Sequence, residues 1–206
     1  MTDRIELLEG KLVNLKLMEK EDVPLAAEWM SNPEVLGEYQ PLEQVSKSEF
    51  KRHSGLRIRI QKTLGTEDKH EEKDFIIEKK DGTKIGMIAH FYVLHVTASI
   101  TPLEIGSFLL PNERGKGYTS EAVAIMVDYL FLSKNTMRIQ ATTDTRNLSS
   151  QKVLEKTGFK KEGTLRKYVF IRGELRDAHL YSILREEWKE PRILTRKRIS
   201  PAKKGI

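Results

Sequence analysis

The chain of 206 residues is long enough for one domain with a substantial core, and a second full domain would be crowded. It has no cysteine, which excludes a disulfide framework, a thiolate metal site and a cysteine nucleophile. No apolar run is long enough to span a bilayer and no signal-peptide core follows Met1, so we expect a cytoplasmic protein without a membrane segment.

The excess of basic residues is concentrated at the C-terminus. Residues 189–206 carry seven lysines or arginines and one acid, Glu190, an excess of +6 that equals the formal net charge of the whole chain. Pro191 and Pro201 interrupt this stretch, which predicts a domain of residues 1–188 followed by a basic, flexible tail at 189–206. The tail could contact RNA, a ribosome or anionic lipid, but a solvated terminus without a partner is the more common case.

The first elements expected along the chain are a strand and two helices. Residues Lys11–Met18 alternate between apolar and polar side chains, as in a strand with one buried face. A helix is expected over Asp22–Met30, because Asn32-Pro33 disfavours its continuation. A second helix is expected over Ser46–Leu64, which opens with the Ser-x-x-Glu spacing of a capping box.

Strands dominate the rest of the chain. Asp74–Lys80 and Lys84–Val96 are expected to be strands, and Asp81-Gly82 between them is a strong hairpin signal. The pattern then predicts a strand at Leu103–Leu110, a helix at Tyr118–Lys134, a strand at Met137–Thr143, a helix at Leu148–Thr157 stopped by Gly158, and strands at Lys160–Ile171 and Leu175–Glu186. This order favours one mixed sheet with helices packed on it, which is an α/β (α+β) fold class.

The most informative stretch joins the Leu103–Leu110 strand to the helix that follows. Residues 112–122 read Asn-Glu-Arg-Gly-Lys-Gly-Tyr-Thr-Ser-Glu-Ala, so a strand turns into a helix through two glycines. Backbone N–H groups at a helix N-terminus bind anions, Gly115 and Gly117 permit a close approach, and Arg114 and Lys116 add positive charge. The stretch therefore predicts a phosphate or pyrophosphate site. It is neither a P-loop nor a complete G-x-G-x-x-G, because Ser120 stands in place of the last glycine.

The surroundings of this motif carry a resemblance to a known family. Together with Glu104–Pro111 upstream and Asp144–Gly163 downstream, it resembles the acetyl-CoA site of the GNAT-type N-acetyltransferase superfamily. The most similar branch contains the ribosomal-protein-alanine N-acetyltransferases and many small-amine acetyltransferases, and the likeness runs from about Leu8 to Trp188. It implies the acyl-CoA N-acyltransferase fold, a mostly antiparallel sheet of about seven strands with helices on both faces. Asn112 departs from the pattern, which usually has Gln or Arg there, and we expect a weaker contact at that position.

The resemblance also implies how the cofactor is held. Acetyl-CoA would be the co-substrate, with no metal, and its pantetheine arm would lie where the central strand splays from its neighbour. Unpaired backbone groups of Phe108 and Leu110 would bind the arm, and an N–H of Phe108 or Leu109 would stabilise the tetrahedral oxyanion. The pyrophosphate would be held by Arg114, Gly115, Lys116, Gly117, Tyr118 and Thr119, with help from Asn147.

Two serines are candidates for the general acid. Asn147 is a good helix N-cap whose side chain would accept the N–H of Ser150. The resemblance implies that the Ser150 hydroxyl protonates the departing CoA thiolate, and Ser149 is the alternative if the helix begins one residue later.

The general base is left open among three residues. Glu104 on the central strand, acting through a water, and Asp177 or His179 in the last strand are candidates, and an exposed strand charge is the ordinary alternative for each. Because there is no cysteine to carry an acyl group, we expect the amine to attack directly within a ternary complex.

The acceptor is a protein N-terminus or a small-molecule amine, and the sequence does not choose between them. Other kinds of protein stay open: a CoA-binding sensor or scaffold without turnover, or an RNA- or ribosome-associated protein that binds through its basic tail. A homodimer is also open. The histidine spacing gives no metal site, since His90 and His95 would point to opposite faces of one strand.

Overall fold

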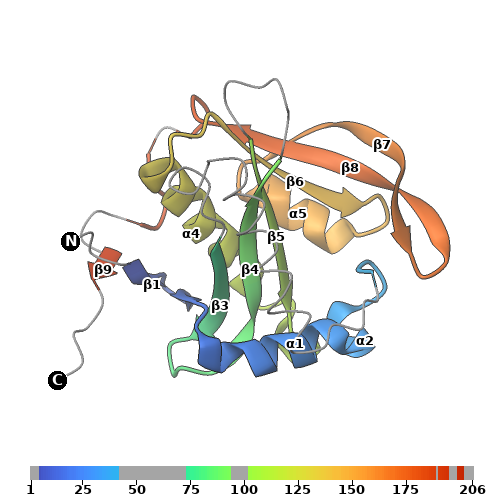
Figure 1. Cartoon of the computed structure of the whole chain (residues 1–206). Coiled ribbons are helices and arrows are strands. Elements are labelled where there is room, and N and C mark those ends of the chain that lie inside the picture. Colours follow the sequence, from blue (N-terminus) through green and yellow to red (C-terminus); the bar gives the residue numbers. More distant parts are fainter. Residues whose placement is uncertain (1–4, 42–72, 94–101, 189, 195–198, 202–206) are drawn as a thin grey trace, which may run out of the picture.

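A single nine-stranded sheet forms the centre of the molecule (Figure 1). The computed structural model describes residues 5–41, 73–93, 102–188, 190–194 and 199–201. The strands of this part are β1 Ile5–Glu9, β2 Val13–Leu17, β3 Lys73–Lys79, β4 Lys84–Tyr92, β5 Leu103–Leu109, β6 Arg138–Asp144, β7 Lys160–Ile171, β8 Glu174–Leu184 and β9 Ile199–Pro201. Their order is β7-β8-β6-β5-β4-β3-β2-β1-β9. Only the β5–β6 pair is parallel among these strands, which confirms a mixed, mostly antiparallel sheet.

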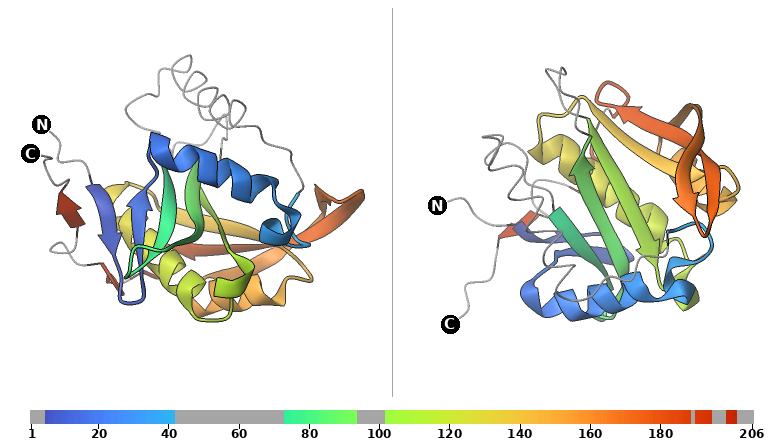
Figure 2. Two further views of the ribbon diagram at one scale, coloured as in Figure 1. Left: turned by 90° about the horizontal axis from the view of Figure 1, so that it is seen from below. Right: turned by 45° about the vertical axis from the view of Figure 1, so that its right-hand side comes forward.

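Helices cover both faces of the sheet, as expected (Figure 2). Helices α1 (Val23–Ser31) and α2 (Pro33–Leu36) lie on one face, and α4 (Tyr118–Ser133) and α5 (Leu148–Lys156) lie on the other. Two buried clusters correspond to the two faces. The smaller one joins α1 and α2 to the sheet through Ala26, Trp29, Val35, Ile76 and Met87. The larger one surrounds α4, whose residues are buried continuously over 122–131, so this helix is buried on all sides.

Several local predictions are confirmed because they depend on neighbouring residues. Gly158 adopts a φ of +96° directly after α5. Its N–H donates to the carbonyl of Glu155 at 3.1 Å, and the Phe159 N–H donates to that of Leu154 at 3.0 Å, which is the Schellman pattern of helix termination. The hairpin at Asp81-Gly82 joins β3 to β4 in antiparallel register. The helix expected over Ser46–Leu64 lies outside the described residues.

The strand count of about seven was too low. Strands β1 and β9 are the additional ones, and each is short and near an end of the chain. They pair with each other at the edge of the sheet, with Leu8 opposite Ile199. Because β9 pairs with a strand at the other end of the chain, the local sequence pattern of neither strand predicts this pairing.

Part of the segment expected to be a flexible tail makes contacts with the domain. Besides β9, the backbone N–H groups of Arg192, Ile193 and Leu194 donate to the carboxylate of Asp128 in α4, at 3.1, 2.7 and 2.9 Å. Leu194 is fully buried in the larger cluster. A fully buried acceptor in the centre of the domain therefore holds this part of the basic segment, and basic composition alone did not reveal it.

Candidate active site

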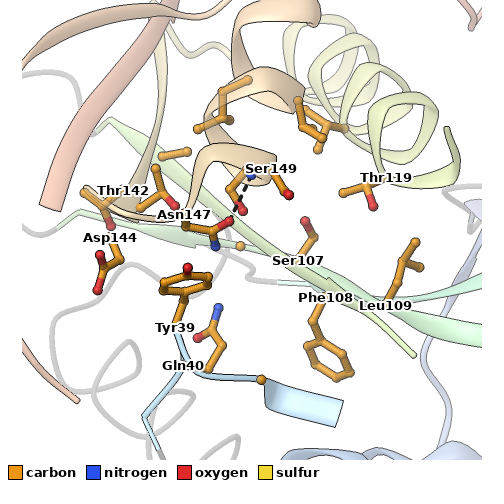
Figure 3. A pocket seen from close by; sticks show the side chains of 18 of the residues that line it. Tyr39, Gln40, Ser107, Phe108, Leu109, Thr119, Thr142, Asp144, Asn147 and Ser149 are labelled. Atoms are coloured by element: carbon orange, nitrogen blue, oxygen red, sulfur yellow. Dashed lines mark hydrogen bonds between the residues drawn. The ribbon is translucent and has the colours of Figure 1, made fainter. Parts of the chain in front are cut away.

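A groove opens where β5 and β6 part. The two strands pair only at Leu103–Ile139 and Glu104–Gln140, although both continue well beyond those residues. The groove that follows has a volume of about 930 Å³. It is bounded by β5, by the start of α4, by the end of β6 with the start of α5, and by the segment 36–41 after α2. Figure 3 shows that Ser107, Thr119 and Ser149 lie on one side of β5, while Phe108, Tyr39 and Gln40 lie on the other.

The register of β5 decides which of its backbone groups face the groove. The Leu110 N–H donates to the carbonyl of Ile85 at 2.9 Å, so Leu110 bonds toward the β4 side. Opposite residues of an antiparallel pair alternate between hydrogen-bonded and non-bonded positions. Leu109, which lies opposite Gly86, therefore directs its N–H and C=O toward the groove, and Phe108, which lies opposite Met87, does not.

This register corrects part of the predicted cofactor contact. The backbone groups of Phe108 and Leu110, expected to meet the pantetheine arm, point to β4 instead. Those of Ser107 and Leu109 face the groove. Of the two residues predicted to donate to the oxyanion, Phe108 and Leu109, it is therefore Leu109 whose N–H faces the groove. The Phe108 ring packs edge-on against Trp29 at a centroid distance of 6.4 Å and belongs to the cluster on the α1 face.

The glycine loop presents its backbone to the groove. Gly115 and Gly117 have φ values of +77° and +85°, which favour glycine. A Cβ placed on Gly115 would meet no atom within 4 Å, so the space beside it is open. Gly117 is the N-cap of α4 and caps it with no side chain, which leaves the N–H groups of the first turn available beside Thr119 and Ser120 in the groove lining. This cradle fits the pyrophosphate of CoA.

The charged side chains of the loop have partners within the protein, although Arg114 also lines the groove. The Arg114 guanidinium donates from Nε to the Leu109 carbonyl at 3.1 Å and from Nη2 to the Val35 carbonyl. Lys116 forms an ion pair with Glu113 at 2.9 Å and is not among the groove-lining residues. Tyr118 packs on the larger cluster and does not line the groove either. Gly115, Gly117 and Thr119 are thus the predicted residues of this loop that best fit phosphate binding, because backbone groups and a hydroxyl are what they present.

The start of α5 supplies the hydroxyl groups expected near the thioester. Asn147 is the N-cap, and its Oδ1 accepts the Ser150 N–H at 3.1 Å, as predicted. Asn147, Ser149 and Ser150 all line the groove. Ser150 is half-buried and Ser149 is exposed. The predicted acid and its alternative therefore lie on the same helical turn, facing the open edge of β5.

The three candidate bases lie in different surroundings, and none is a groove-lining residue. Glu104 is held at the closed end of the split, where its oxygens accept from Gln140 Nε2 at 3.0 Å and from Thr142 Oγ1 at 2.8 Å. Asp177 accepts the backbone N–H of Lys167 at 2.8 Å. Lys167 has a φ of +51° in an irregular part of β7, so Asp177 stabilises an unusual backbone conformation.

His179 is the third candidate, and its ring is engaged on the outer strands. Its two nitrogens contact Lys161 Nζ at 2.9 Å and Thr164 Oγ1 at 3.0 Å. Burial, and then the charge of Lys161, lower the pKa of His179 below its ordinary value. Of the side chains that these three candidates contact, Thr142, the partner of Glu104, lines the groove.

Asp144 was missed as a site residue. It ends β6, is 4% exposed and lines the groove beside Asn147. Burial on its own raises the pKa of the Asp144 carboxyl, but hydrogen bonds from Arg146 and the charges of Arg146 and Arg176 outweigh it, so the pKa lies below its ordinary value. An acid at a strand end followed by Arg two residues later was the available signal, because the Arg146 N–H closes a turn onto Asp144 Oδ1 at 2.8 Å.

Two further observations concern metals and membranes. The described residues contain no group of three or more His, Cys, Asp or Glu side chains that could hold a metal ion. In that same part of the chain, no helix combines the length and the apolar character that crossing a bilayer requires.

Comparison with known proteins agrees with this geometry. Residues 13–160 match the family model described as an acetyltransferase (GNAT) domain. The uncharacterized N-acetyltransferase p20 of Bacillus licheniformis is 31% identical over 186 residues, which cover 89% of this chain and 99% of that protein. The structure of ribosomal-protein-S5-alanine acetyltransferase from Vibrio fischeri matches with a TM-score of 0.71 and 25% identity over 89% of this chain and 99% of that chain.

A further structure is similar in fold. Spermidine N-acetyltransferase from Vibrio cholerae, solved with CoA and spermine, matches with a TM-score of 0.72 and 20% identity over 87% of this chain and 99% of that chain. The family predicted from the two sequence motifs is thereby confirmed. The chain belongs to the GNAT acetyltransferase family and is an N-acetyltransferase.

Proposed function

We propose that this enzyme transfers the acetyl group of acetyl-CoA directly to a primary amine within a ternary complex. The observation that carries the proposal is the convergence of three features on one groove: the glycine loop, the unpaired edge of β5 and the start of α5. An anion cradle, a row of backbone donors and a pair of hydroxyl groups are what binding and cleaving an acyl thioester require.

The cofactor is assigned to the α4–α5 side of the sheet. Gly115, Gly117 and Thr119 bind the pyrophosphate through the first turn of α4, where the helix dipole favours an anion. The outward backbone groups of Ser107 bind the arm as an added strand would, because the Leu109 carbonyl already accepts from Arg114. Acetyl-CoA supplies the acyl group when it is bound. The Leu109 N–H is assigned to the oxyanion, and its position is fixed because the other edge of β5 is paired with β4.

Ser150 is assigned as the general acid, since its N–H is held by Asn147 and its half-buried side chain faces the groove. Glu104 is assigned as the base, acting through a water. It is four residues before Phe108 on β5 and so shares the α1-side face with it, the side from which the acceptor enters. Asp177 is assigned a structural role through Lys167.

Two classes of acceptor are candidates. Protein N-termini are supported by the likeness to the ribosomal-protein-S5-alanine enzyme, and polyamines by the relative named spermidine N(1)-acetyltransferase from Escherichia coli, 29% identical over 125 residues. Tyr39, Gln40 and Tyr168, which line the groove away from the glycine loop, are the side chains that either acceptor would meet.

The deciding experiment is calorimetry followed by a turnover assay. Acetyl-CoA should bind to the purified protein with micromolar affinity, and ATP should not bind, because the groove provides an edge for the pantetheine arm as well as a cradle for phosphate. Release of CoA thiol is then followed with spermidine and with a peptide that has an N-terminal alanine. Binding without thiol release from either amine would point to a CoA-binding sensor; absence of binding would remove the cofactor assignment.

A further inference from the structure

Three arginines hold one short segment that runs on from the end of α2. Arg114 belongs to the glycine loop, and Arg172 and Arg176 belong to the β7–β8 hairpin. The segment begins in α2 and continues through Gly37, which has a φ of +67°, to Tyr39 and Gln40 in the groove wall. Figure 3 shows Tyr39 and Gln40 on the opposite side of β5 from Thr119 and Ser149. Residues 36–41 are called the acceptor wall below.

The contacts of the arginines are all with backbone carbonyls at the start of this wall. Arg172 Nη2 donates to the Gly37 carbonyl at 2.7 Å, and Arg176 Nη1 donates to the Glu38 carbonyl at 2.8 Å. Arg114 Nη2 donates to the Val35 carbonyl just before it. Carbonyls at the end of a helix lack helical partners, and cationic donors are strong partners for them. Because carbonyls are the acceptors, the contacts fix the path of the backbone whatever the side chains of the wall are.

Each arginine is also linked to the elements around the assigned cofactor site, which are the glycine loop, β6 and the start of α5. Arg176 Nη1 lies 3.5 Å from Asp144 Oδ2, and the Asp144 carbonyl accepts the N–H of Asn147, the cap of α5. Arg114 is part of the glycine loop and binds the end of β5 at the Leu109 carbonyl. The turn that carries Arg172 and the strand that carries Arg176 form the β7–β8 hairpin, which packs beside β6. The wall is therefore tied to the elements that hold the thioester.

We propose that Arg172 and Arg176 are positioning residues that set the acceptor wall at the height of the thioester carbonyl and so determine how well the amine is bound and aligned. This inference rests on the proposed function, since it names the residues that orient its acceptor. Neither arginine touches the reacting atoms; both act through Tyr39 and Gln40. Loss of the Arg172 contact moves the wall without removing any contact to the glycine loop or the start of α5, whereas loss of Arg176 also removes its ion pair with Asp144.

The first test requires no acceptor. Hydrogen exchange of the amides of the acceptor wall is compared in the wild type and in Arg172→Ala and Arg176→Ala, with Arg166→Ala, an exposed arginine of β7, as the matched control. Arg172 already has a φ of +50°, so its alanine variant keeps the same backbone strain. Exchange in the wall should become about tenfold faster in both variants, while that of α4 and the affinity for acetyl-CoA stay unchanged. Unchanged exchange in the wall overturns the proposal.

The second test is kinetic and uses spermidine and the N-terminal alanine peptide. Arg172→Ala should lower kcat/KM for the acetylated amine by about 10-fold to 100-fold with the KM for acetyl-CoA unchanged, and Arg172→Lys should restore much of the loss. In a double-mutant cycle with Tyr39→Ala, the two losses should overlap instead of adding, because one acts through the other. Additive losses, or a loss carried by the KM for acetyl-CoA, overturn the proposal. A wild type that acetylates neither amine contradicts the proposed function, and the exchange experiment then still decides on the arginines.

Discussion

The carboxylate of Asp128, in the middle of α4, accepts the backbone N–H of Leu194 at 2.9 Å, across 66 positions of sequence. Each oxygen of Asp128 receives two donors: Oδ1 accepts from Trp188 Nε1 and the Arg192 N–H, and Oδ2 accepts from the N–H groups of Ile193 and Leu194. A fully buried carboxylate is tolerated here because four N–H groups replace its hydration.

Substitution of Asp128 should therefore destabilise the domain strongly. Asp128→Ala leaves four donors without their acceptor inside the core, and we expect a loss of about 3–5 kcal/mol in the free energy of unfolding, measured by urea denaturation. Asp128→Asn should also be destabilised, because its amide group turns a donor toward other donors. Glu186→Ala, at an exposed acid, serves as the control and should change the stability by less than about 0.5 kcal/mol. A loss of less than 1 kcal/mol in Asp128→Ala would contradict the anchoring role.

The ion pair between Arg138 and Glu162 predicts a dependence of stability on pH. Arg138 donates to both Glu162 oxygens at 2.6 Å, and Ser182 Oγ donates to one of them. The hydrogen bond from Arg138 is the main cause that lowers the pKa of Glu162 to about 2, against 4.5 for the free side chain. A depressed pKa stabilises the fold above pH 4.5, and this contribution disappears as the pH falls from 4.5 to about 2.

Glu162→Gln tests this relation directly. Glu162 is 38% exposed, and after allowance for solvent screening we expect the variant to be less stable than the wild type by about 1 kcal/mol at pH 7. The difference should shrink below pH 4.5 and vanish near pH 2. The measurement is urea unfolding of both proteins at pH 7, 4 and 2.5. A difference that stays constant over this range would show that proton binding by Glu162 is not its origin.

The glycine loop predicts a selective loss of cofactor binding. Gly115→Glu places a negative side chain in the open space where the pyrophosphate is assigned, so acetyl-CoA binding should be abolished in calorimetry. Gly82→Glu is the matched control, because Gly82 has a similar φ of +83° and equally open surroundings in the β3–β4 turn. It carries the same backbone strain, and because Gly82 does not line the groove the variant should bind acetyl-CoA like the wild type. Micromolar binding by Gly115→Glu would remove the phosphate assignment.

The sequence was sufficient for features that depend on neighbouring residues. The glycine loop, the Asn147 cap and the stop at Gly158 were predicted because each is specified within a few positions. The family likewise followed from two motifs at suitable spacing.

Other features depended on pairings that a local pattern does not contain. Arg114 Nη2 donates to the carbonyl of Val35, 79 positions earlier in the chain. The positive charge of Arg114 suggested a phosphate contact, but the structure directs its guanidinium to α2. The register of Leu109 against Gly86 decides which backbone groups of β5 face the groove. A prediction from the strand alone chose those of Phe108 and Leu110, which face β4. Strand β9 was missed for the same reason, since its partner β1 lies at the other end of the chain.

The two serines at the start of α5 predict a difference between chemistry and binding. If Ser150 protonates the departing thiolate, Ser150→Ala should lower kcat by about 10²–10⁴-fold while the affinity for acetyl-CoA and the melting temperature stay close to those of the wild type. Ser149→Ala, one residue away on the same turn, is the matched control and should lose much less. Both are measured by thiol release with whichever of the two amines is acetylated faster. The reverse order of losses would assign the acid to Ser149, and equal, small losses in both would show that the thiolate leaves without a proton from α5.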